Sequence, residues 1–69
     1  MSDQQRQENN RQLQEKFRQL QADPNTSADQ WDALGMEYFV AGYILNAGVC
    51  FNRADAVRAA QVVFVLEEV

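Results

Sequence analysis

The chain contains no histidine and only one cysteine, Cys50. These absences exclude Ser-His and Cys-His catalytic pairs, histidine-based metal sites and an intramolecular disulfide. The three glycines lie within a helical pattern, so they do not form a phosphate-binding loop. Glu37 is the only acid in the apolar centre of the chain, and it has no second carboxylate on its face. We therefore expect no enzyme activity, no cofactor and no bound metal.

Basic residues are also few, because 6 Lys and Arg stand against 10 Asp and Glu, for a net charge of −4. Residues 1–22 carry a charge of +1 and residues 23–69 a charge of −5. Binding to nucleic acid needs clustered basic residues, and these acids are too scattered to mimic DNA. We expect a protein partner instead. The polar N-terminus lacks the order of a secretory signal, which favours a cytoplasmic location.

The length of 69 residues predicts one domain, spanning residues 1–69. A chain this short hides only about 60% of its unfolded surface, and oligomerisation is a common remedy. We therefore expect a homodimer.

Residues 3–22 are rich in Gln, Arg, Lys and Glu and contain no Gly or Pro, which predicts a helix. Its apolar residues are Leu13, Phe17 and Leu20, on one narrow seam. The first turns have nothing to bury, so they either fray, dock on a partner or form a solubilising tail. Pro24 and the polar residues after it predict a turn.

A second helix is predicted from about residue 28, capped either by Ser27 with Gln30 or by Thr26 with Asp29. Residues 33–51 contain a single charge, and their apolar positions cover nearly every side of a helix. One stripe, containing Trp31, Leu34, Tyr38 and Leu45, is expected to pack on the first helix. A transmembrane helix is the alternative, disfavoured because Glu37 and Asn46 would lie in the hydrocarbon and no cluster of Lys or Arg flanks the segment strongly.

The last segment, residues 53–67, has helical apolar stripes, and Asn52 is a plausible cap. Residues 62–66 also have high β-propensity, so a terminal strand competes. A third alternative is one long helix over residues 28–67, bent near Gly48. The predicted fold is thus all-α: a helical hairpin with a long aromatic second helix and a possible short third helix.

Seven aromatic residues in so short a chain point to binding, because Tyr, Trp and Arg dominate the energetics of interfaces. Tyr38 and Phe39 are adjacent, so only one of them can face the core. The other faces a second protomer or a target. The residues expected to contact a partner or to form the dimer are Arg18, Tyr38, Phe39, Tyr43 and Phe51.

The Gln- and Arg-rich first helix, the Pro turn and the aromatic second helix with Tyr38, Phe39 and Tyr43 resemble small phage-encoded helical proteins that inactivate a host regulator. In particular, the layout is similar to that of a dimeric anti-activator that binds a LuxR-type quorum-sensing regulator and a type IV pilus assembly ATPase. The resemblance implies inhibition of a host protein in the bacterial cytoplasm by occlusion of a surface needed for DNA binding.

A second hypothesis is a small helical-hairpin co-chaperone of a secretion system, whose apolar face would be filled by a helix of its cargo. An inhibitor needs a stable dimer on its own. A co-chaperone would gain order only with its cargo.

Overall fold

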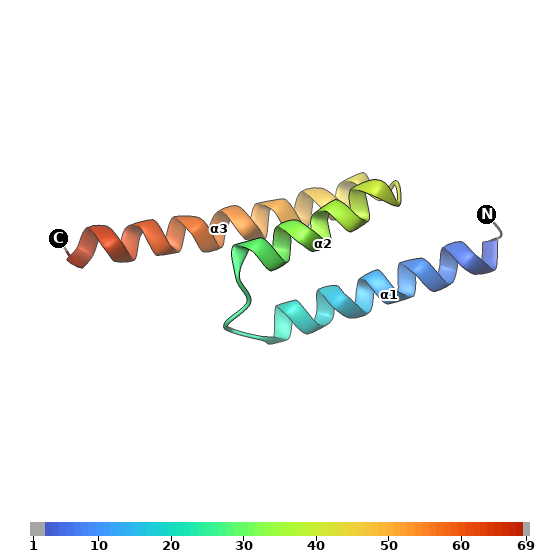
Figure 1. Cartoon of the computed structure of the whole chain (residues 1–69), viewed down its shortest axis with the longest axis horizontal. Helices are drawn as coiled ribbons and strands as arrows, with labels where there is room; N and C mark the ends of the chain where they lie inside the picture. Colours follow the sequence, from blue (N-terminus) through green and yellow to red (C-terminus); the bar gives the residue numbers. More distant parts are fainter. Residues whose placement is uncertain (1–2, 69) are drawn as a thin grey trace.

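The chain folds into three helices, shown in a computed structural model (Figure 1) that describes the backbone of residues 3–68 and the side chains of residues 3–62. Helix α1 spans Asp3–Ala22, α2 spans Ala28–Val40 and α3 spans Ile44–Glu68. The described residues contain no strand, so the all-α prediction is confirmed. Helices α2 and α3 lie side by side as a hairpin, α1 runs along α2, and α3 extends well beyond the start of α2.

Helix α1 has the bounds predicted for it, and it meets the rest of the chain through its apolar seam. Leu13 is buried, whereas Phe17 and Leu20 are partly buried against the core. Residues 3–8 are exposed, as their polar composition predicts.

The α1–α2 connection is fixed by short-range hydrogen bonds that decide between the two predicted caps. Ser27 and Gln30 form the capping box: the Ser27 N–H donates to Gln30 Oε1 at 2.8 Å, and the Gln30 N–H donates to Ser27 Oγ at 3.2 Å. The buried Thr26 hydroxyl does not cap α2, because it donates to the Leu20 carbonyl of α1 at 2.6 Å. The connection therefore ties the end of α1 to the start of α2.

The predicted long second helix is wrong, because α2 ends at Val40 and the chain reverses at Gly42. Gly42 has a φ of +93°, which glycine adopts without steric cost. The Tyr43 N–H donates to the Tyr38 carbonyl at 2.9 Å, and the Gly42 N–H donates to the Phe39 carbonyl at 3.0 Å. These two bonds are the Schellman motif that closes many helices.

Helix α3 begins at Ile44 and runs for 25 residues, so the third helix is the longest of the three. It includes residues 62–66, which makes the alternative of a terminal strand wrong. It also passes through Gly48 and Asn52 without a break, so neither residue marks a boundary.

The core lies between α2 and α3, with a smaller contribution from α1. Gly35 allows the Phe51 ring of α3 to pack directly against α2, since a Cβ added there would lie 2.5 Å from Cε1 of Phe51. Leu45, predicted to pack on α1, is instead 87% exposed because the reversal at Gly42 places it on the outer side of α3. The buried apolar residues are Leu13, Ala28, Trp31, Leu34, Tyr38, Ala47, Cys50 and Ala54.

Candidate protein-interaction surface

The five residues predicted to contact a partner have different surroundings. Tyr38 is 2% exposed, and its ring meets that of Tyr43 edge-on with the centroids 6.2 Å apart. Phe51 is half-buried against Gly35. Arg18 is exposed on α1 and pairs with Glu15 at 3.5 Å. Within this chain Tyr38 and Phe51 therefore belong to the internal packing, whereas Phe39, at 53% exposure, faces outward.

Large apolar side chains are exposed at the closed end of the hairpin. Met36, Phe39 and Val40 lie in the last turns of α2, and Ile44 is the first residue of α3. Their exposed fractions are 54%, 53%, 80% and 57%. We call these four residues the tip surface. Scattered exposed apolar residues are ordinary, but a group at one end of a small protein is typical of an interaction site.

A groove of about 510 Å³ borders the tip surface, between the start of α1 and the end of α2. Its apolar lining includes Met36, Val40 and Tyr43. Glu37 also lines the groove and accepts a hydrogen bond from Lys16 Nζ of α1 at 2.8 Å. Arg6 and Asn9 line the α1 side. The groove thus has apolar, polar and charged residues in its lining.

A second groove, of about 420 Å³, lies between α1 and α3 and brings together Arg18 and Tyr38 from the predicted set. Phe17 and Val49 add apolar surface, and Gln14, Gln21 and Asn46 add amide groups. Val49 is 44% exposed, so this groove continues onto the outer side of α3.

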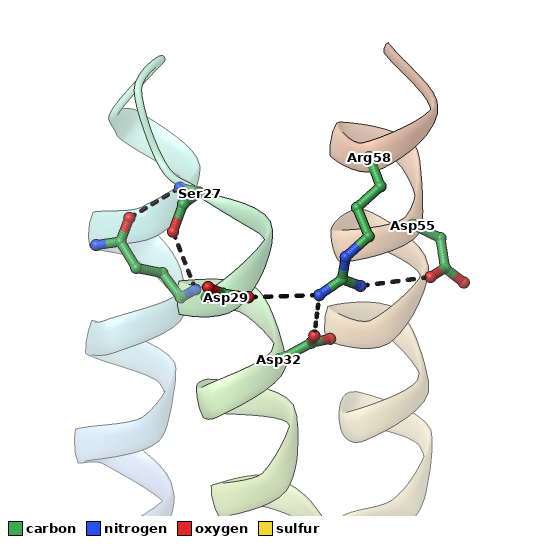
Figure 2. Close-up of polar contacts among 6 residues, drawn as sticks. Ser27, Asp29, Asp32, Asp55 and Arg58 are labelled. Atoms are coloured by element: carbon green, nitrogen blue, oxygen red, sulfur yellow. Dashed lines mark hydrogen bonds and ion pairs between the residues drawn. The ribbon is translucent and has the colours of Figure 1, made fainter. Parts of the chain in front are cut away.

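Charged side chains join the helices at the opposite end of the hairpin. Arg58 of α3 forms a hydrogen-bonded ion pair with Asp32 of α2, and it lies 3.5 Å from Asp29 and 3.8 Å from Asp55 (Figure 2). The hydrogen bond to Asp32 is the main reason why the pKa of Arg58 is raised. The cluster holds α3 against the first turn of α2.

Arg53 joins all three helices through its guanidinium. The group lies 5.3 Å from the centre of the Phe17 ring on α1 and 5.2 Å from that of Trp31 on α2. The two rings meet at 68° with their centroids 5.2 Å apart. Cation–π contacts of this kind stabilise by about 0.5–2 kcal/mol each. The sequence offered no signal for this contact, because it depends on the crossing of three helices.

The titratable groups of the core are held in their neutral forms. Burial raises the pKa of the Cys50 thiol, an effect that nearby Arg53 partly opposes. Burial, with a smaller contribution from Cys50, raises the pKa of Tyr38. A buried neutral thiol is a poor nucleophile, so Cys50 acts as a small apolar residue.

The described residues contain no group of three or more His, Cys, Asp or Glu side chains placed to hold a metal ion. None of their helices combines the length and apolar character needed to cross a bilayer.

Comparison of the chain with protein-family models, with curated proteins and with solved structures finds no match.

Tyr43 was predicted as a contact residue and lines the groove beside the tip surface, whereas Met36, Val40 and Ile44 were not predicted. The sequence signal that could have identified them is Gly42. Reading this glycine as the end of a helix places its apolar neighbours at an exposed turn.

Proposed function

We propose that this protein is a non-enzymatic, homodimeric inhibitor that binds a host protein through the tip surface and its adjoining groove. The observation that carries the proposal is the exposure of Met36, Phe39, Val40 and Ile44 around one turn. Aromatic and large apolar side chains that remain exposed in a folded monomer are the usual anchors of protein interfaces.

The charges at the groove favour a partner with both apolar and charged groups. The charged residues of the groove lining are Glu37, which is paired with Lys16, and Arg6. A partner segment with an apolar face and an acidic residue fits this lining. The resemblance to phage anti-activators names the target class that we propose: a LuxR-type quorum-sensing activator, with a type IV pilus assembly ATPase as a second target.

The experiment is a binding measurement between the purified full chain and a purified LuxR-type activator, repeated with Phe39→Ala and Val40→Ser. Both variants should keep the fold and weaken binding at least about tenfold, which corresponds to the loss of one interface anchor. Val62→Ser is the matched control, because Val62 is 58% exposed and lies far along α3 from the tip. No binding by the unaltered chain, or equal losses in all three variants, would contradict the proposal.

A thermal melt of the isolated chain tests the co-chaperone alternative. An inhibitor that binds through a preformed surface melts cooperatively on its own. A chain that gains a cooperative transition only when a cargo helix is added would favour the co-chaperone.

A further inference from the structure

The outer side of α3 carries a regular seam whose residues are exposed within the part of the chain that the structure describes. Positions 45, 49, 52, 56 and 59 follow one another at alternating steps of four and three residues, the heptad spacing of a coiled coil. At about 100° per residue they fall within an arc of about 80° on one side of the helix. The seam residues are Leu45, Val49, Asn52, Ala56 and Ala59.

The seam lies opposite the face that α3 uses in the core. The core face of α3 consists of Ala47, Cys50 and Ala54, all of them buried. The seam is centred about 170° from this face around the helix, so α2 cannot reach it. Accordingly Leu45 is 87% exposed and Val49 is 44% exposed, and every other seam residue is exposed as well.

The length of α3 strengthens the case for an outside partner. In Figure 1 the C-terminal part of α3 runs on past the start of α2 with no helix beside it. In the sequence the heptad spacing continues over this part with Val63 and Leu66. A helix that extends alone from a small domain gains little from its neighbours, and helical stability in proteins comes mainly from packing.

We infer that a second copy of this chain packs along the α3 seam, parallel and in register, with Asn52 facing Asn52 of the other copy. The seam is then the interface of the homodimer in the proposed function, on which this inference rests, whatever the identity of the target.

Three properties of the seam favour a second copy as its occupant. By this spacing Val49 and Ala56 take the a positions of the heptad and Leu45, Asn52 and Ala59 take the d positions, so the seam contains Val at a and Leu at d, which favours parallel two-stranded packing. Asn52 stands at a d position, and its amide can both donate to and accept from the Asn52 of a second copy. Residues 44–62 contain two Arg and one Asp, so two copies of this stretch repel each other little.

Small residues in the seam set how closely the helices approach. Ala56 and Ala59 have small side chains. Gly48 lies at the edge of the seam, and a Cβ added there would meet nothing within 4 Å. The second groove, with Arg18 and Gln14 of α1, borders Val49 on the same side. A helix seated on the seam therefore also contacts α1, which enlarges the interface beyond two helices.

The test is the mass of the full chain in solution, by multi-angle light scattering or sedimentation, for the unaltered chain, Leu45→Glu and Val40→Glu. The unaltered chain should show twice the 7.9 kDa of one chain. Leu45→Glu should weaken the dimer at least about a hundredfold, because both copies lose a leucine and gain a like charge. Val40→Glu, at a comparably exposed tip position, should remain dimeric and lose target binding.

Ala56→Glu is a second seam variant, and it should also dissociate the dimer without unfolding the chain because Ala56 is exposed. Circular dichroism verifies the helix content of each variant. A monomeric unaltered chain, or equal dissociation of the Leu45 and Val40 variants, overturns the inference. A dimer that survives Leu45→Glu and Ala56→Glu overturns it as well. If the proposed function is wrong and the dimer inference is right, the unaltered chain is a dimer and target binding is absent in every variant.

Mild oxidation of Ala56→Cys tests the parallel register. Parallel, in-register packing places the two introduced thiols together, so this variant should form a covalent dimer much faster than Gln61→Cys, whose position lies off the seam. Buried Cys50 stays out of the reaction. Cross-linking of Ala56→Cys with Val49→Cys in a mixture, and not with itself, would overturn the parallel arrangement.

Discussion

The α2–α3 hairpin and helix α1 are held by different kinds of contact. The hairpin is closed by fully buried side chains such as Tyr38, Cys50 and Ala54, and by the approach of Phe51 to Gly35. Helix α1 contributes one buried side chain, Leu13, and is otherwise attached through the partly buried Phe17 and Leu20, a contact with Arg53 and an exposed ion pair. Apolar burial gives the hairpin most of the stability, and α1 is held by contacts that each contribute little.

The largest effect is expected from removing a hairpin side chain. Tyr38→Ala should lower the free energy of unfolding by about 3 kcal/mol or more, because it empties a fully buried site. Phe39→Ala, one residue along, should change it by about 0.5 kcal/mol, as is usual on a surface. Urea denaturation of both variants measures the difference. Equal losses would mean that the tip surface is part of the core.

The second effect concerns Gly35 and Gly48. Both lie inside helices, where glycine has the same low helix propensity, but their surroundings differ. Gly35→Ala should force the Phe51 ring to move and cost about 1–3 kcal/mol. Gly48→Ala meets nothing within 4 Å and should stabilise by about 0.5–1 kcal/mol. The double variant Gly35→Ala with Phe51→Leu should recover part of the loss. Identical shifts in melting temperature for the two single variants would argue against the close approach.

A smaller effect is expected where α1 is attached. Arg53→Met keeps an apolar stem and removes the charge over Phe17 and Trp31, so it should cost about 1 kcal/mol. Hydrogen exchange should accelerate in α1 more than in α2. Arg11→Met is the control, because Arg11 is exposed and pairs with Glu8 of the same helix. Uniform acceleration in both helices would mean that α1 is an equal part of the core.

The smallest effect is expected for Lys16→Met, which breaks the exposed pair with Glu37. The loss should be about 0.5 kcal/mol at low salt and should vanish as salt increases. A loss that persists in high salt would show that the Lys16 stem contributes packing instead.

The sequence was sufficient to predict α1, its seam and the turn at Pro24, because each depends on neighbouring residues, and it narrowed the cap of α2 to two alternatives, of which the structure shows Ser27 with Gln30. It was also sufficient to predict that Tyr38 and Phe39 diverge. It did not locate the end of α2, because Gly42 was interpreted as part of a continuous helical pattern. The Arg53 contacts and the Arg58 cluster were missed for a different reason: they join residues far apart in the chain, and only the arrangement of the hairpin brings them together.

The reversal at Gly42 also decides whether this fold stays within one chain. An alanine there would disfavour the left-handed backbone by about 1–2 kcal/mol and favour a helix that continues from α2 into α3. The two apolar faces would then be carried apart, and each would find its match only on another molecule. Gly42→Ala should therefore convert part of the protein into a domain-exchanged form that separates by size and returns to the original form only after unfolding.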